Sequence, residues 1–308
     1  FISTQSVVLA VNLQVVKLPE RGTSVLASSA NSVVGGGFTT LSVAAAQGVP
    51  ANLAAPLGTG PNSFAVRKLL SAENITPMTG TFVGDIGVSI VMIEADGTTA
   101  TVRTAGVETE PTAAALDSIE LFPGDLVHIN GAELATPAAD VITHWGSNLP
   151  EGVRLVVATS PAVDEIPPTV WLPLLGRADI VTANIREAAA LTGIVESSFP
   201  GRSLRDLMRP DAALVRRLGE SGCDVQVGAD ADSVHVPPFP AHRVDTTGVG
   251  DTHVAAMCAG LLQGRDLVQS CLRANAAAAL MIAREFSWPV PSPADIDQVL
   301  ETGVVGAP

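Results

Sequence analysis

The chain has 308 residues and a formal net charge of −14, from 17 basic and 31 acidic residues. Among the basic residues only Lys17 and Lys68 are lysines. Such an acidic chain is poorly suited to bind nucleic acid or an anionic membrane through a general positive field. Neither lysine lies in a GxxxxGK[ST] sequence, which excludes a P-loop. Any phosphate would therefore be bound by backbone amides, a metal or arginine.

The composition predicts a globular protein with a large core, because 47% of the residues are hydrophobic and 16% are charged. No apolar run reaches the roughly 18 residues of a membrane span. The N-terminus shows no secretory signal, and the cysteines Cys223, Cys258 and Cys271 include no CxxC pair. We therefore expect free thiols and a cytoplasmic protein. Four histidines show no metal-ligand spacing: His128, His144, His235 and His242.

Short apolar runs bounded by turn residues predict strands along the chain. Their β-branched residues are typical of strands buried on both faces of a parallel sheet. Helical spacing of apolar residues predicts helices between them, at 64–72 and 187–192. This alternation indicates an α/β fold with a central, mostly parallel sheet flanked by helices. The predicted strands are Val7–Val11, Asp125–Ile129, Val153–Ala158, Asp179–Thr182 and Cys223–Val227.

Two regions, 14–34 and 79–104, instead alternate polar and apolar residues. In the second, residues 88–94 and 99–103 flank an Asp96-Gly97 pair, which is a strong hairpin signal. We expect these regions to form a small β-sheet that stands off the main domain as a lid. The alternative is that they extend the edge of the main sheet. The whole chain, 1–308, is taken as one domain.

The last third of the chain is predicted to be helical. Residues 251–262 are apolar and stop at Gly264. Asp266 and Gln269 then have the spacing of a capping box, which opens a helix predicted to run through Arg284.

The segment Val244–His253 carries the clearest chemistry, because a turn containing Gly248 and Gly250 leads directly into an apolar helix. Glycines allow neighbouring amides to point at one spot, and a helix N-terminus adds partial positive charge, which together predict an anion site without lysine. Asp251 beside that site could act as general base toward a hydroxyl that attacks a phosphoryl group. The alternative is that Asp251 is an N-cap.

The sequence Asp-Thr-Thr-Gly-Val-Gly-Asp at 245–251 resembles the C-terminal signature of the ribokinase-like (PfkB) carbohydrate kinase family, DTxGAGD. Asn184–Glu187 resembles the NxxE motif of that family. Four further segments resemble motifs of the family and follow in the same order along the chain, so that the resemblance spans nearly the whole chain. They are the LPxxG turn at Leu18–Gly22, the di-glycine at Val33–Gly37, the GxDxxG segment at Leu57–Pro61 and the nucleotide loop at Val227–Asp230.

The resemblance implies a ribokinase-like fold and an ATP- and Mg²⁺-dependent kinase that also uses a monovalent cation. Asp251 resembles the catalytic base, and the amides of Gly248, Val249 and Gly250 would form the anion hole. Asn184 and Glu187 resemble the pair that organises phosphate and Mg²⁺. The remaining implied roles are nucleotide binding by Gly228 and Ala229, adenine contact by Asn275, and cation binding by Asp245 and Thr247.

Departures from the family pattern fall on the substrate side. The sugar-gripping N-x-D reads Asn12-Leu13-Gln14, Thr40 replaces the Asn that follows Gly36 and Gly37, and Gly60 replaces the Asp of GxDxxG. Charged hydrogen bonds contribute about 1.5–3 kcal/mol, so an ordinary ribose grip is not expected.

We therefore expect a kinase of a sugar or sugar-like small molecule. The alternatives are a nucleoside or vitamin-precursor kinase and a non-catalytic ligand-binding member. Arg103, after the lid hairpin, would reach an anionic substrate or be a solvated surface residue. Because family members often dimerise through the lid, a homodimer is also an expectation.

Overall fold

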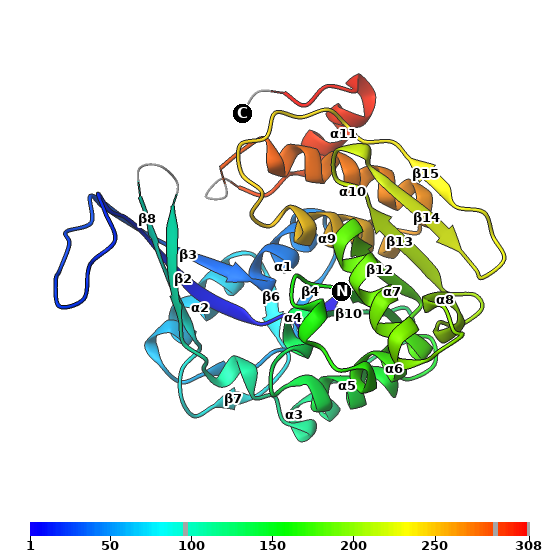
Figure 1. Ribbon diagram of the computed structural model, residues 1–308, viewed down its shortest axis with the longest axis horizontal. Helices are drawn as coiled ribbons and strands as arrows, with labels where there is room; N and C mark the ends of the chain where they lie inside the picture. Colours follow the sequence, from blue (N-terminus) through cyan, green and yellow to red (C-terminus); the bar gives the residue numbers. More distant parts are fainter. Residues whose placement is uncertain (95–97, 286–288, 307–308) are drawn as a thin grey trace.

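A nine-stranded sheet forms the centre of the computed structural model, which describes residues 1–94, 98–285 and 289–306 (Figure 1). All neighbouring strands pair in parallel except β14, which is antiparallel to both of its neighbours. From edge to edge the strands are β15 (Val234–Val236), β14 (Cys223–Val227), β13 (Ala213–Arg217), β12 (Ile180–Asn184), β11 (Arg154–Ala158), β10 (Leu126–Asn130), β1 (Ile2–Ser3), β4 (Ala51–Leu53) and β6 (Ile75–Pro77).

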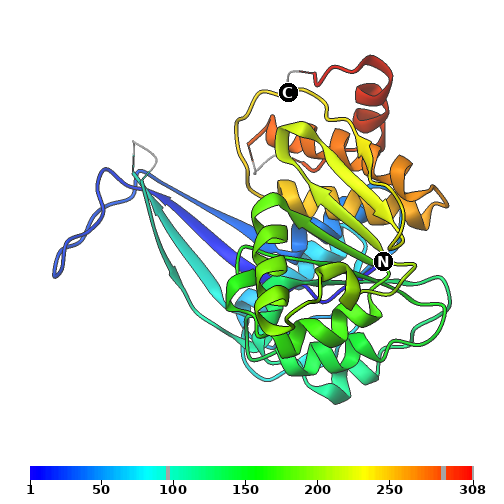
Figure 2. The same cartoon turned by 45° about the vertical axis from the view of Figure 1, so that its right-hand side comes forward.

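Helices cover both faces of this sheet, and each face has its own buried core (Figure 2). Successive side chains of a strand point to opposite faces, so that Leu126 packs into one core and Val127 into the other. The first core packs against α1 (Gly37–Ala46), α2 (Pro61–Ala72), α9 (Val249–Leu262), α10 (Leu267–Ile282) and α11 (Pro293–Thr302). The second packs against α3 (Ala113–Asp117), α4 (Gly131–Leu134), α5 (Ala139–Ser147), α6 (Pro168–Arg177), α7 (Ile185–Ser198) and α8 (Leu204–Leu207).

A four-stranded sheet stands off the main body (Figures 1 and 2). Its order is β3 (Ser29–Gly36), β2 (Val7–Gln14), β8 (Val88–Ile93) and β9 (Thr99–Arg103). Its strands thus begin before residue 14 and reach beyond residue 34, while residues 15–28 form a loop. The predicted Asp96-Gly97 turn lies outside the described residues. A separate parallel pair joins β5 (Leu57–Gly58) to β7 (Thr81–Phe82).

The prediction that Val7–Val11 is a strand of the central sheet was wrong, because this run lies in the four-stranded sheet as part of β2. Only Val7 in that run is buried; the residues after it are half-buried on a two-sided sheet. The central sheet instead takes Ile2 and Ser3 between β10 and β4. A strand of two residues is too short to appear as an apolar run in the sequence, whereas the eight-residue strand β2 does appear as one.

The other predicted strands are confirmed within two residues as β10, β11, β12 and β14. Asp266 caps α10 by accepting a hydrogen bond of 2.8 Å from the amide of Gln269. The three cysteines are free and buried, as expected. Within the described ranges, no helix combines the length and the apolar character that crossing a membrane would need.

Two neighbouring leucines of α2 test the first core. Leu70 is 0% exposed and Leu69 is 45% exposed. We expect Leu70→Ala to lower the free energy of unfolding by about 2–5 kcal/mol, because it removes buried methyl groups and leaves a cavity. Leu69→Ala should cost less than about 1 kcal/mol. Urea denaturation monitored by circular dichroism measures both, and equal losses would contradict the packing described here.

Candidate active site

The N-terminus of α9 presents backbone amides in the arrangement that binding an anion would need. Gly248 lies in the left-handed region with φ 71°, which turns the chain into the helix that begins at Val249. The amide of Thr252 donates to the carbonyl of Gly248 at 2.8 Å. In the described part of the chain no backbone carbonyl accepts the amides of Gly250 or Asp251. These amides therefore remain to bind an anion in the field of the helix dipole.

Asp251 lies within the first turn of α9 and is not its N-cap, which is Gly248. Its carboxylate accepts a hydrogen bond of 3.1 Å from Nε2 of Gln5. The Oε1 atom of Gln5 in turn accepts a bond of 2.7 Å from the hydroxyl of Thr40, which is fully buried on α1. Desolvation by burial raises the pKa of Asp251, while the bond from Gln5 and the charge of Arg217 act against that rise.

Gln5 is a site residue that the sequence did not reveal. It lies in the short link between β1 and β2, outside every motif. Only the position of this link beside α9 brings its amide to Asp251. Thr40, predicted as a substrate-binding residue, is instead engaged with Gln5.

Asn184 and Glu187 form a capping box at the start of α7. The side chain of Asn184 accepts from the Glu187 amide at 2.8 Å, and Glu187 Oε2 accepts from the Asn184 amide at 3.0 Å. The same Oε2 accepts from the hydroxyl of Thr159 at 2.7 Å and from Arg217 at 3.1 Å. The capping box holds the carboxylate at the carboxyl edge of the sheet, and all these bonds leave Oε1 for a further ligand.

Arg217 is a second residue that sequence reasoning missed. It ends β13, directly beside Asn184 of β12 in register, and forms a largely buried ion pair with Glu187. Its Nη1 lies 2.7 Å from the position that a Cβ at Gly250 would take. The absence of a side chain at Gly250 thus lets the guanidinium approach the N-terminus of α9. No sequence motif marks this arginine, because two adjacent arginines on a strand resemble a solvated edge.

The residues fit Mg²⁺ only as part of a nucleotide complex. Among the described residues there is no group of three or more His, Cys, Asp or Glu side chains that could hold a metal ion. Mg²⁺ is commonly held by one or two carboxylates together with substrate phosphates and waters. Oε1 of Glu187, close to the anion site, suits that arrangement.

The structure does not bring Gly228 and Ala229 to this site. Because β14 is antiparallel to β13, Val227 lies opposite Ala213 while Cys223 lies opposite Arg217. Gly228 and Ala229 therefore follow β14 beside the N-terminal end of β13, away from the C-terminal ends of the parallel strands where Asn184 and Arg217 lie. Their amides donate to the carbonyls of Ala212 and Pro210, at 3.0 and 2.8 Å. The turn that does reach the carboxyl edge is the one between β13 and β14, at residues 218–222.

Asn275 lies on α10 and is almost fully buried, with its amide already bonded. Its Oδ1 lies 3.2 Å from Nε2 of His253, and its Nδ2 donates to the carbonyls of Val236 and Pro237 at 3.2 and 2.9 Å. The predicted adenine contact would have to replace one of these bonds.

The two residues predicted to bind a monovalent cation, Asp245 and Thr247, lie together before α9. Asp245 accepts a hydrogen bond of 2.8 Å from the amide of Thr247.

Asn12 and Gln14 lie in the outer half of the small sheet, paired with Asn31 and Ser29. At about 3.3 Å per residue, Gln14 is roughly 30 Å along the chain from Gln5. These two predicted substrate residues are therefore not brought to Asp251. Arg103 is exposed on β9, opposite Ser89.

Gly36 and Gly37 lie at the root of the small sheet, against the chain that carries Gln5. A Cβ at Gly36 would lie 2.3 Å from the carbonyl oxygen of Ser6, and one at Gly37 would lie 2.2 Å from that of Gln5. Gly36 also has a positive φ of 65°. The di-glycine thus allows two backbone segments to meet beside Asp251.

The missing aspartate at Gly60 is compensated by another residue. The carboxylate of Asp85 accepts from the amides of Asn62 and Ser63 at 2.9 and 2.7 Å, at the start of α2. A Cβ at Gly60 would lie 2.3 Å from the carboxyl carbon of Asp85. These bonds outweigh desolvation, the largest single influence, and lower the pKa of Asp85. Asp85 therefore occupies the place where a side chain at 60 would be.

Glu133 brings another buried carboxyl close to Asp251. One oxygen accepts from the amide of Ser6 at 3.0 Å, and in the described part of the chain the other is buried without a hydrogen-bond partner. Burial, helped by the charge of Asp251, raises the pKa of Glu133 to about 7.

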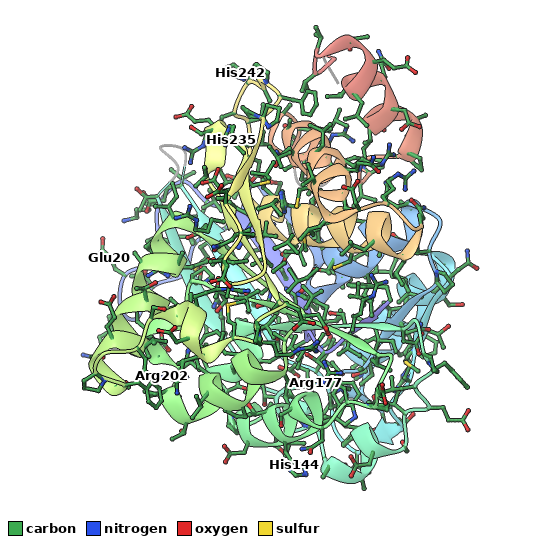
Figure 3. The ribbon with its side chains drawn as sticks, turned by 90° about the vertical axis from the view of Figure 1, so that its right-hand side faces the viewer. Glu20, His144, Arg177, Arg202, His235 and His242 are labelled. Atoms are coloured by element: carbon green, nitrogen blue, oxygen red, sulfur yellow. The ribbon has the colours of Figure 1, made fainter. Side chains whose placement is uncertain are left out.

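Three histidines lie far apart in the structure (Figure 3). His144 lies on α5 at one end of the molecule, and His235 and His242 lie at the other end.

Glu133→Gln should change how stability depends on pH. The folded protein keeps a proton on Glu133 between pH 4.5 and about 7, where the unfolded chain has lost it. Stability from this group is therefore present at low pH and is lost as pH rises through that window. We expect Glu133→Gln to be more stable than the wild type at pH 8, by roughly 3 kcal/mol at most, and to lose that advantage near pH 4.5.

Urea denaturation across pH 4.5–8 measures this difference. Glu196→Gln, at an exposed position on α7, is the matched control and should leave the pH profile unchanged. A constant difference between Glu133→Gln and the wild type would contradict the burial of the Glu133 proton.

Comparison with known proteins places the chain in a family. A model of the pfkB family carbohydrate kinases matches residues 5–287. The chain is 27% identical over 268 residues to an uncharacterized sugar kinase of Escherichia coli (strain K12), YegV, covering 86% of this chain and 83% of that relative. It is 29% identical over 275 residues to the ribokinase of Bacillus subtilis (strain 168), covering 86% and 87%.

Solved structures share the fold. The nucleoside kinase of Methanocaldococcus jannaschii, an archaeal member of the ribokinase family, has a TM-score of 0.78 at 17% identity, with 97% of each chain covered. Arabidopsis thaliana ribokinase, complexed with ribose and ATP, has a TM-score of 0.75 at 20% identity, with 97% and 98% covered. Because the family model matches nearly the whole chain, this protein belongs to the pfkB family of carbohydrate kinases.

Proposed function

We propose that this family member is an ATP-dependent, Mg²⁺-requiring phosphotransferase that phosphorylates a hydroxyl of a sugar or nucleoside-like molecule, with Asp251 as general base. The observation that carries the proposal is the position of the Asp251 carboxylate beside the unpaired amides at the start of α9. A base must lie within hydrogen-bond reach of the hydroxyl whose proton it takes. The amides would hold the phosphoryl group that this hydroxyl attacks.

The other residues of the site take complementary roles in this proposal. Oε1 of Glu187 would contact Mg²⁺ or its bound water, and the capping box with Asn184 keeps that carboxylate in place. The turn at residues 218–222 would lie along the nucleotide phosphates. The ion supplies charge neutralisation of the phosphates when it is bound.

The acceptor would bind between the small sheet and Asp251. Asp251 places a carboxylate there, which favours neutral polyols over anionic sugars. The names of the relatives, a ribokinase and a nucleoside kinase, support ribose-containing acceptors.

A homodimer through the small sheet stays a prediction. The cross-strand pair Ile90 and Val102 is consistent with it, because these two apolar side chains are 38% and 55% exposed.

Turnover of ATP against neutral sugars, sugar acids and nucleosides tests the proposal. On the best acceptor we expect Asp251→Asn to lower kcat by about 10²–10⁴-fold, because it removes the base. Asp266→Asn is the matched control, since Asn also serves as an N-cap of α10. Equal rates for Asp251→Asn and the wild type would remove Asp251 from the reaction. ATP binding without turnover on any acceptor would favour a non-catalytic member.

The bond from Gln5 should set the acid limb of the pH profile. Gln5 donates to the ionised carboxylate and so lowers the pKa of Asp251. We expect Gln5→Ala to shift the acid limb of kcat/KM to higher pH, because the carboxylate of Asp251 loses this donor. Thr40→Val should shift it in the same direction, because Thr40 orients Gln5. Gln226→Ala, a surface glutamine on β14, should leave the profile unchanged. An unmoved limb in Gln5→Ala would contradict this role.

A further inference from the structure

We propose that Arg217 is a catalytic residue that contacts the phosphoryl group in transfer, and supplies the fixed positive charge that this lysine-poor site otherwise lacks. The inference rests on the proposed phosphotransfer and goes beyond it, because no sequence motif of the chain marks Arg217. It comes from the position of one side chain between Glu187 and the start of α9.

Two contacts fix the position of the guanidinium. Nη2 donates to Oε2 of Glu187 at 3.1 Å, and the side chains of Arg217 and Glu187 are only 14% and 4% exposed. On the other side, Nη1 lies 2.7 Å from the place of a Cβ at Gly250. The cation therefore spans the gap between the residue suited to Mg²⁺ and the amides suited to phosphate.

The guanidinium has more donors than its protein partners use. It carries five N–H groups in a planar fork. Nε is buried, and within the described residues it has no hydrogen-bond partner. Leaving a donor of a buried cation unpaired is costly, and a single carboxylate does not satisfy the fork. Nη1 instead faces the start of α9, and an anion with several oxygens bound between Arg217 and the amides of Gly250 and Asp251 would accept from it.

The charges around Arg217 indicate which anion this is. Glu187 and Asp251 both lie close enough to act on the charge of Arg217. A permanently bound carboxylate ligand would add a third negative charge beside the base. A phosphoryl group in transfer instead shares its charge among Mg²⁺, the amides and the guanidinium.

The reaction step balances without any further reactant. The acceptor oxygen forms a bond to the γ-phosphorus of ATP, and the bond from that phosphorus to the β,γ-bridging oxygen breaks. The electron pair of the broken bond stays on ADP, and the hydroxyl proton goes to Asp251. Arg217 stays protonated throughout and stabilises the charge on the equatorial oxygens.

The test compares Arg217→Gln with Arg216→Gln. Arg216 is the neighbouring arginine on β13, 48% exposed and paired with Asp224 at 3.1 Å. We expect Arg217→Gln to lower kcat on the best acceptor by about 10²–10³-fold, the usual cost of losing one transition-state donor. The KM for the acceptor should stay within about threefold, and Arg216→Gln should match the wild type. Guanidinium at millimolar concentration should restore part of the rate in Arg217→Ala.

A binding measurement separates this inference from the proposed function. With Mg²⁺, the wild type should bind ADP more tightly when aluminium fluoride, a mimic of the transferring phosphoryl group, is present. Arg217→Gln should bind ADP alone as the wild type does and lose that gain. If Arg217→Gln fails to fold, Arg217→Lys replaces it, with a smaller loss expected because the charge stays but the fork does not.

Retention of the gain in Arg217→Gln, or kcat within threefold of the wild type, would overturn the role of Arg217 and leave the kinase proposal intact. A wild type that binds ADP but shows no gain with aluminium fluoride would overturn both.

Discussion

The site depends on keeping one carboxylate charged while it is partly withdrawn from water. Desolvation favours the protonated form of Asp251, which could not take the role of base proposed for it. Three features oppose it: the amide of Gln5, the positive end of α9 and the charge of Arg217. Each comes from a different part of the chain, yet all meet at the carboxyl edge of the parallel sheet. There the link after β1, the end of β13 and the start of α9 lie side by side.

The net charge of −14 does not exclude phosphate binding at this site. The positive potential that phosphate binding needs is local, because it comes from backbone amides and one guanidinium. Glu187 pairs with that guanidinium and is also the terminal residue of the capping box that starts α7. The same carboxylate therefore stabilises a helix and orients a cation, and in the proposed function it would also contact a metal, so that a change at Glu187 would affect both the fold and the site.

The parts of the molecule with a strong local signal could be predicted from the sequence. The buried strands β10, β11 and β12, the glycine turn that opens α9 and the Asn184–Glu187 pair all rest on contiguous residues. The rest depends on topology. The two-residue strand β1 carries no periodicity, the antiparallel β14 moves Gly228 to the opposite edge, and Gln5 and Arg217 reach the site only through pairing between distant segments.

The carboxylate of Asp85 at the start of α2 bears on how such chains are compared. It fills the volume that a side chain at position 60 would need, so the two acids are alternatives that exclude each other in space. A carboxylate carried at position 60 would reach the same helix terminus from a different segment of the chain. The residue type at position 60 therefore does not by itself tell whether this carboxylate is present in the folded protein.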